Sequence, residues 1–349
     1  MKRLRGRSRS HGLVRLALFV AVAGVAAAQH AADWPDWAYG ALEPLTAGSR
    51  VAVACASGSL PYDCAYQEAP VPDDGVRRSL PGSTLRFTRN ETYADYAPAD
   101  WYPAEHPAMP DIVAHGHAPL RLRACALCHY ANGQGRMENA AVAGLPEAYI
   151  LQQLQSFADG TRRSADVRKA NTNEMAMIAA RLTGEERRQA AAYFAAMPLR
   201  PSVRIIESAA APQVQATSNG LMLPVGGAPT VPLGRRIIVV PETPQQTLLS
   251  RDPHGLWLAY VPVGSVAAGA QLAASGGGRA QPCALCHGPA LRGLADIPGI
   301  AGRTPTYLMR QLWDFRQGAR HSVLMQPVAQ SLSAADMLNL SAYLASLEP

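Results

Sequence analysis

Cys125-Ala126-Leu127-Cys128-His129 and Cys283-Ala284-Leu285-Cys286-His287 are two copies of one five-residue sequence, C-x-x-C-H. Each fixed position suits one step in attaching haem c: two thiols add across the vinyl groups, and the following imidazole reaches the iron. A zinc knuckle would need further ligands at knuckle spacing, and none follow. A thiol redox pair does not require the histidine. The motifs therefore predict two covalently bound haem c groups, attached through Cys125, Cys128, Cys283 and Cys286, with His129 and His287 as iron ligands.

An internal repeat surrounds the two motifs. Identical residues keep the offset of 158 positions that separates the motifs: Gly144 and Gly302, Tyr149 and Tyr307, Leu154 and Leu312, Phe157 and Phe315, Gly160 and Gly318, and Arg162 and Arg320. The offset then falls to 150, which aligns Met175 with Met325, Leu182 with Leu332, Thr183 with Ser333 and Tyr193 with Tyr343. The first copy therefore carries eight extra residues between Arg163 and Glu174, and the chain contains the same unit twice.

Each repeat has the pattern of a helical unit. Pro146 and Pro305 stand where the first turn of a helix tolerates proline, and apolar residues then recur at helical spacing. Gly160 and Gly318 supply C-terminal stops. The last helix of each repeat begins with a capping-box pattern, Thr183-x-x-Glu186 and Ser333-x-x-Asp336. The prediction is a mainly α-helical protein in which each repeat packs around the large apolar body of a haem.

Met175 and Met325 are the candidates for the sixth iron ligand. They stand at equivalent repeat positions, in Met-x-x-Ile/Val-Ala sequences, and we place both in the loop between the two predicted helices. A thioether favours ferrous iron and occupies the position where oxygen or peroxide would bind. Two filled sites favour electron transfer over oxygen chemistry. Met177 is close enough to compete with Met175, and ordinary core packing is the alternative role for these side chains.

The two repeats resemble tandem class I cytochrome c domains, and they are most similar to the di-haem cytochrome c4 family. The resemblance covers about residues 113–200 and 263–349, and it is carried by C-x-x-C-H, by Tyr-x-x-x-x-Leu-x-x-Phe-x-x-Gly-x-Arg and by the methionine sequences. It implies periplasmic electron transfer with His129/Met175 and His287/Met325 ligation. Two departures, Tyr130 in place of Gly288 and Ala140 in place of Pro298, predict different surroundings for the first haem.

Residues 1–28 have the pattern of a secretory signal peptide. Six basic residues precede an apolar run from Leu16 to Ala26, and a small-residue cleavage sequence follows; an uncleaved anchor is the alternative. No later stretch approaches a membrane-spanning length. The whole chain has 32 Lys and Arg against 26 Asp and Glu, so loss of the signal leaves 26 against 26. The basic charge therefore gives no support for nucleic-acid binding.

The predicted compartment is the periplasm, because haem attachment and disulfide formation both occur outside the bacterial cytoplasm. Cys55 and Cys64 remain after haem attachment, and they form either a local disulfide or two free thiols.

Two further segments separate the parts of the chain. Residues 29–112 form an N-terminal extension rich in Pro, Tyr and Trp, which wraps the first haem domain or, less favoured, docks a partner. Residues 201–262 form a linker or small β-subdomain between the haem domains, with strands expected near Val203–Ile206, Arg236–Val240 and Leu256–Val261. The predicted architecture is thus two haem domains, 113–200 and 263–349, with an extension and a β-containing linker.

These observations predict a periplasmic di-haem electron carrier that is not itself an enzyme. Its partners would be a periplasmic dehydrogenase as donor and an oxidase or another cytochrome as acceptor, an assignment made by analogy. One alternative is a di-haem peroxidase, which needs one haem with an open distal site and is disfavoured by the matched methionines. Another is a fixed cytochrome subunit of a dehydrogenase, with residues 29–112 as its docking element.

Overall fold

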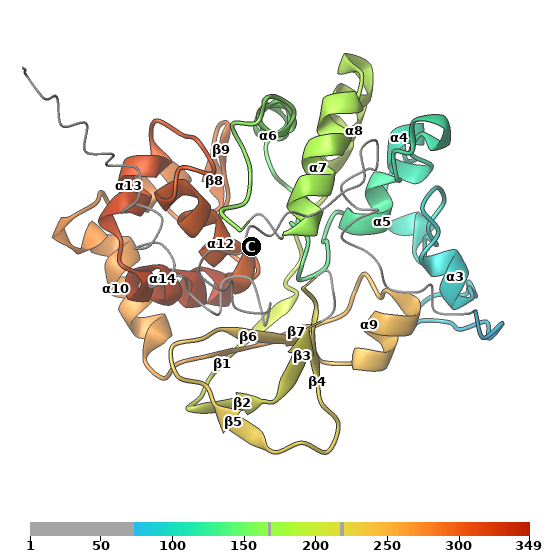
Figure 1. Cartoon of the computed structure of the whole chain (residues 1–349). Helices are drawn as coiled ribbons and strands as arrows, with labels where there is room; N and C mark the ends of the chain where they lie inside the picture. Colours follow the sequence, from blue (N-terminus) through green and yellow to red (C-terminus); the bar gives the residue numbers. More distant parts are fainter. Residues whose placement is uncertain (1–72, 167–168, 217–219) are drawn as a thin grey trace, which may run out of the picture. The chain divides into compact units, whose positions relative to one another are not determined.

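The computed structural model describes residues 73–166, 169–216 and 220–349, drawn in colour in Figure 1. They all belong to one of the two units into which the chain divides. The predicted signal peptide and the Cys55–Cys64 pair lie outside the described residues.

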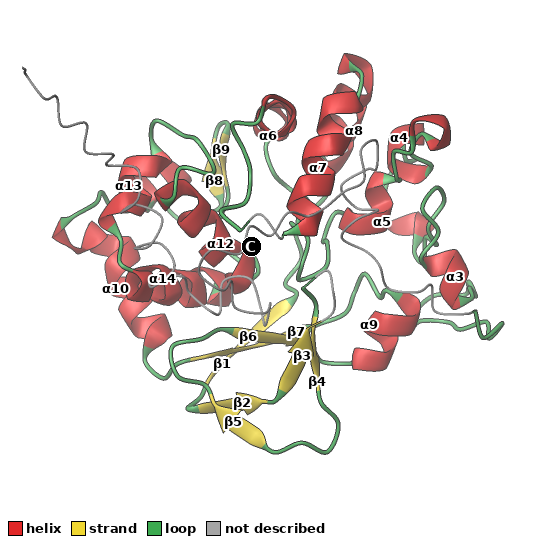
Figure 2. Cartoon of the chain, in the orientation of Figure 1, coloured by secondary structure: helices red, strands yellow, loops and turns green. Residues whose placement is uncertain are grey.

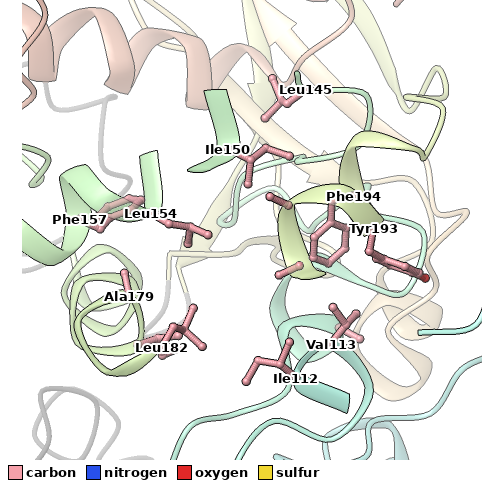
Figure 3. Close-up of a cluster of buried hydrophobic side chains, with 14 of the residues drawn as sticks. Ile112, Val113, Leu145, Ile150, Leu154, Phe157, Ala179, Leu182, Tyr193 and Phe194 are labelled. Atoms are coloured by element: carbon pink, nitrogen blue, oxygen red, sulfur yellow. The ribbon is translucent and has the colours of Figure 1, made fainter. Parts of the chain in front are cut away.

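The first haem motif lies in a group of helices formed by residues 111–195. The helices are α4 (Asp111–Ala114), α5 (Cys125–His129), α6 (Glu147–Asp159), α7 (Ala170–Arg181) and α8 (Gly184–Ala195). Helix α6 follows Pro146 and stops at Gly160, whose φ of +85° suits glycine. Figure 3 shows Ile150, Leu154 and Phe157 of α6 facing a shared interior with Tyr193 and Phe194 of α8. This cluster buries the apolar face predicted for the first repeat.

The second haem motif lies in an equivalent group of helices. They are α10 (Ser265–Ser275), α11 (Ala284–His287), α12 (Pro305–Arg316), α13 (Met325–Ser331) and α14 (Ala334–Ser346). Helices α10 and α14 cross so closely that a Cβ on Gly269 would lie 2.0 Å from the Asn339 carbonyl oxygen. The first repeat has only the four-residue α4 in the place of α10. The two helical groups are therefore similar without being identical.

Both predicted capping boxes are confirmed. The Thr183 hydroxyl accepts from the Glu186 amide at 3.2 Å, and the Glu186 carboxylate accepts from the Thr183 amide at 2.7 Å. Ser333 and Asp336 make the same pair of bonds at 3.1 and 2.9 Å. Each box satisfies amide groups that the first turn of a helix cannot pair, so the starts of α8 and α14 are set locally.

The segment between the helical groups is a small β-containing region, as predicted. Strand β7 (Trp257–Val261) pairs in parallel with β1 (Val203–Glu207) and antiparallel with β6 (Ile238–Pro241). Two-stranded ladders join β2 (Ala210–Pro212) to β5 (Thr230–Pro232) and β3 (Val214–Ala216) to β4 (Met222–Pro224). The short pair β8 (Gly293–Leu294) and β9 (Ile297–Pro298) follows the second haem motif. Figure 2 shows these strands in yellow between the helical segments of the chain.

The described part of the N-terminal extension packs against the first haem domain and the β-containing region. It contains α3 (Arg89–Thr92), which contacts α9 (Pro244–Ser250), and a 3-10 turn at Pro103–Glu105; a second such turn, Ala118–Leu120, lies just beyond it. The Trp101 indole donates to the Ser250 carbonyl at 2.8 Å. The Ala124 amide, one residue before the first haem motif, donates to the Asp95 carbonyl at 2.8 Å. Residues 73–112 therefore contact both the first haem domain and the linker, which agrees with the predicted wrapping; that role stays a prediction.

Candidate haem-binding sites

The first C-x-x-C-H motif forms helix α5 and places its histidine in the interior. The His129 ring donates from Nδ1 to the Ala140 carbonyl at 2.8 Å. This bond orients the ring and leaves Nε2 as the nitrogen that can bind a metal. Burial lowers the pKa of His129, although the Ala140 carbonyl acts in the opposite direction. Burial thus favours the neutral imidazole, which is the form that ligates iron.

A large cavity separates His129 from Met175. Its empty volume is about 1420 Å³, including space open to solvent. Apolar side chains from α6, α7, α8 and the adjoining loops form most of its wall, namely Val142, Leu145, Ile150, Leu154, Phe157, Ile178, Leu182 and Phe194. Figure 3 shows several of them converging on one space. Cys125 and Cys128 line the same cavity. An apolar cavity with two thiols, an imidazole and a thioether on its wall fits a covalently attached haem.

The methionines lie at helices rather than in a loop, so that part of the prediction was wrong. Met175 is in the second turn of α7, and Met325 is the first residue of α13. The helix begins at Ala170 and runs through Asn171, Thr172 and Asn173 although Asn and Thr are weak helix formers, because α7 packs against α6 and tertiary contact overrides local propensity. Met175 lines the cavity, whereas the Met177 sulfur accepts a hydrogen bond from Arg181 at 3.2 Å. The structure thus favours Met175 over Met177, and its ligation stays a prediction.

A polar network that the sequence reasoning missed closes one side of this cavity. The Arg162 guanidinium donates to Gln153 at 2.9 Å and to Gln311 at 3.0 Å. The Arg320 guanidinium donates to the same two side chains, at 2.8 Å each. Arg162 also bonds Tyr307, and Arg320 bonds Tyr149. The pairs Gln153/Gln311, Arg162/Arg320 and Tyr149/Tyr307 are each separated by 158 positions, so the network joins the repeats with approximate twofold symmetry.

The signal for this network was present in the repeat, since the Arg and Tyr pairs are among its matched positions. The tyrosines were expected on the helices of the repeat, and no role was predicted for the arginines. Both arginines are buried, at 8% and 5% exposure, and the pKa of Arg162 is lowered by burial and by the neighbouring Arg320. Arginine stays protonated in proteins, so two adjacent buried cations favour an anionic neighbour. The carboxylates of a haem in the adjoining cavity would supply that charge.

The second motif repeats the proximal geometry in a more exposed setting. The His287 ring donates from Nδ1 to the Pro298 carbonyl at 2.8 Å, and burial lowers its pKa. Ala140 and Pro298 therefore hold their histidines equally well, because a main-chain carbonyl does not depend on the side chain attached to it. The surroundings of the two haems were expected to differ, but the hydrogen bond to the histidine ring has the same length at both sites. Cys283 is half-buried and Cys286 is exposed.

Tyr130 adopts a backbone conformation that suits glycine. Its φ and ψ are +61° and 160°, close to the +82° and 163° of Gly288 in the second copy. A non-glycine residue there costs on the order of 1–3 kcal/mol unless its surroundings compensate. The Tyr130 side chain is buried and packs near the Arg251 guanidinium, 5.6 Å from its ring centroid. Arg251 also donates to the Leu127 carbonyl and stacks on Tyr93 of the extension. The strained residue thus lies beneath the extension.

The same five-residue sequence differs in exposure between its two copies. Leu127 is 6% exposed, whereas Leu285 is 63% exposed. A small pocket beside Ala126 and Tyr130 is lined by residues of the extension and of the linker, namely Ala99, Asp100, Trp101, Tyr102, Glu105, His106, Arg251 and Pro253. The Asn132 side chain adds a hydrogen bond to the Pro253 carbonyl at 3.2 Å. This chain therefore covers its own first motif.

Among the described helices, none has the length and apolar character needed to cross a membrane.

The chain is similar in sequence to known cytochromes. The family described as cytochrome c matches residues 113–198. A thiosulfate dehydrogenase electron acceptor of Stutzerimonas stutzeri is 27% identical over 242 residues, which cover 68% of this chain and 84% of that protein. A cytochrome c4 of Pseudomonas aeruginosa is 25% identical over 230 residues, covering 64% and 83%. A cytochrome c-554(548) of Halomonas halodenitrificans is 39% identical over 80 residues, covering 22% of this chain and 96% of that protein.

Proposed function

This chain belongs to the cytochrome c family, and from that premise we propose that it accepts electrons from a periplasmic dehydrogenase at its second haem and passes them to another cytochrome or an oxidase. It is a cytochrome c4-like di-haem electron-transfer protein that carries haem c covalently. The proposal concerns its partner, its compartment and the residues that serve each haem. The observation that carries it is the unequal exposure of the two motifs.

Eight residues hold the two haems. Thioethers to the first haem form at Cys125 and Cys128, and thioethers to the second form at Cys283 and Cys286. His129 and His287 ligate from the proximal side, and Met175 and Met325 ligate from the distal side. The bound haem supplies a one-electron ferric/ferrous couple, and methionine ligation stabilises the ferrous state. Met175 lines the cavity that His129 also lines, which supports this assignment for the first site.

The interface between the repeats supports electron passage from one haem to the other. The two arginines of this network are buried, and Arg162, Gln153 and Gln311 line the first haem cavity from both repeats. Fixed dipoles in a buried site need less rearrangement than water when a charge changes nearby. A change of charge on one haem is therefore met by groups that are already oriented, and this favours transfer between the two sites.

The second haem is the point of contact with the partner in this proposal. Cys286 lies at the surface and would hold one edge of the second haem there. The neighbouring Leu285 presents an apolar side chain to solvent. At the first motif, Ala126 and Leu127 are buried: Ala126 lines a pocket with residues of the extension, and Arg251 of the linker donates to the Leu127 carbonyl. A partner's redox centre would therefore come closer to the second haem than to the first.

A dehydrogenase donor is supported by the relatives. Two of them, from Stutzerimonas stutzeri and Thiomonas intermedia, are described as thiosulfate dehydrogenase electron acceptors. Periplasmic location is supported by the signal-peptide pattern of residues 1–28. Thiosulfate dehydrogenase is accordingly the first donor to test.

Visible spectra of the haem-loaded protein, oxidised and reduced, with and without carbon monoxide, test the ligand assignment. Two haems per chain, a far-red methionine-to-ferric-haem band and no carbon monoxide response would agree with two closed sites. Carbon monoxide binding to the wild-type protein would contradict it. Peroxide-dependent turnover in the same sample would replace the electron carrier with the di-haem peroxidase. Reduction by thiosulfate dehydrogenase plus thiosulfate, followed in a stopped-flow instrument, tests the donor.

A further inference from the structure

Arg303 is a buried arginine placed between the two repeats. It is 4% exposed and immediately precedes the N-cap of α12. Its Nε donates to the Gly299 carbonyl at 2.7 Å within its own repeat. Its Nη1 donates to the Ala141 carbonyl at 2.7 Å, and its Nη2 donates to the Ala143 carbonyl at 3.4 Å, both in the first repeat. One planar guanidinium thus bonds main-chain carbonyls on both sides of the interface.

Two of these carbonyls occupy equivalent places in the two repeats. Ala141 and Gly299 are 158 positions apart. Ala141 directly follows Ala140, whose carbonyl accepts from the His129 ring, and Gly299 directly follows Pro298, whose carbonyl accepts from the His287 ring. Arg303 therefore holds the proximal loop of each haem site one residue beyond the bond that orients its histidine.

The first proximal loop depends on Arg303 more than the second does. Pro298 has a ring that restricts its own backbone, whereas Ala140 has none. Two of the three Arg303 bonds also go to the first loop. The residue equivalent to Arg303 in the first repeat is Leu145, which has no donor to return the contact. The interaction is therefore one-sided: the second repeat stabilises the proximal loop of the first.

The charge of Arg303 adds an electrostatic effect. Burial lowers its pKa, but an arginine stays protonated in a protein, so a positive charge persists beside both proximal loops. Within the described residues, the Arg303 guanidinium donates to three main-chain carbonyls. These carbonyls are neutral, so they do not cancel the positive charge. A nearby positive charge favours the haem state that holds one more electron.

We infer that Arg303 is a positioning residue for both haems, which clamps the two proximal loops and raises both reduction potentials, with the larger effect at the first haem. This rests on haem attachment at both motifs and is independent of the partner proposed above. The geometry makes Arg303 a physical link between His129 and His287.

The test uses the haem-loaded protein and a spectroelectrochemical titration of both potentials. In Arg303→Met the loops lose the clamp and the charge. We expect the ratio of ferrous to ferric first haem at a fixed solution potential to fall about tenfold, which is 59 mV for a one-electron couple, and the same ratio for the second haem to fall by less. Arg303→Lys keeps the charge without the three-way clamp, so it should recover only part of the change. Arg316→Met is the matched control, since Arg316 donates to the Leu332 carbonyl within one repeat.

Ala140→Pro, made in the Arg303→Met background, gives the first loop the proline of the second. It should move the first potential back towards the wild-type value and leave the second where it is, which also assigns the potentials to the haems. Unchanged potentials with a lower melting temperature would reduce Arg303 to a structural brace and overturn the inference. Equal shifts in Arg316→Met would also overturn it. If Arg303→Met fails to load haem, Arg303→Lys carries the same test.

Discussion

Residues 125–129 and 283–287 have the same sequence, yet the Ala-Leu pair between the two cysteines is buried in the first copy and exposed in the second. Leu127 is 6% exposed and Leu285 is 63% exposed. Burying a leucine side chain stabilises a fold by about 1.5–3 kcal/mol. Leu127 therefore contributes to the stability of the fold, whereas the side chain of Leu285 stays available for contact with a partner. The comparison teaches that one haem-attachment sequence can serve an internal site and an external one, depending on what packs above it.

The largest expected effect comes from removing one distal ligand at a time. Met325→Ala should open the second haem and bind one carbon monoxide per chain, because the thioether that closed the site is gone. Met175→Ala should do the same at the first haem, whose cavity Met175 lines. Difference spectra measure how much carbon monoxide each variant binds. An unchanged spectrum in either variant would rule out that ligand.

A charge placed on the exposed copy should slow electron exchange. In Leu285→Glu, a carboxylate must lose water when a partner docks beside Cys286, so we expect reduction by thiosulfate dehydrogenase to slow about tenfold. Leu256→Glu is the control, because Leu256 is 40% exposed on a different segment. Stopped-flow rates at two ionic strengths are the measurement. If Leu285→Glu is reduced as fast as the wild-type protein, the second haem is not the point of contact with the partner.

Exchanging the residues after the two histidines should reveal the backbone strain. Gly288→Ala places a Cβ 2.6 Å from the Gly293 carbonyl at a positive φ, and we expect it to lower the free energy of unfolding by about 3 kcal/mol. Tyr130→Gly relieves strain but loses buried aromatic contacts, so its net loss should be smaller, about 1–2 kcal/mol. Chemical denaturation of the holoprotein gives both values. A larger loss in Tyr130→Gly would mean that the strain at Tyr130 is negligible.

The smallest effect concerns the pH dependence of the cover over the first motif. Asp100 accepts from His106 at 3.0 Å and raises the pKa of His106, against the opposing effect of burial. A raised pKa means that the contribution to stability is complete below the unfolded value of about 6.5 and is lost as pH rises through the folded value. Amide exchange at Leu127 should therefore quicken modestly between pH 6 and 8, after correction for intrinsic rates. Asp100→Asn should remove that dependence, and a retained dependence would assign it to another group.

Much of the fold followed from local patterns in the sequence. The ends of α6 were predicted from Pro146 and Gly160, and the starts of α8 and α14 from their capping boxes, because each signal acts within a few residues. The loop assigned to Met175 was wrong because α7 packs against α6, and that tertiary contact outweighs the weak helix propensity of Asn171, Thr172 and Asn173. The strands near 203, 238 and 257 were located, but the parallel pairing of β1 with β7 joins residues more than fifty positions apart.

The sequence by itself determined the haem-attachment chemistry, since the two thiols and the imidazole of each motif are joined by a few covalent bonds. It also determined the duplication and the helix boundaries. Only the tertiary structure decided that Arg303 bonds carbonyls on both sides of the interface and that two arginines share two glutamines. It also decided which copy of C-A-L-C-H faces solvent. The reason is physical: burial and long-range hydrogen bonds depend on residues over a hundred positions away, and an identical pentapeptide carries no record of what will pack above it.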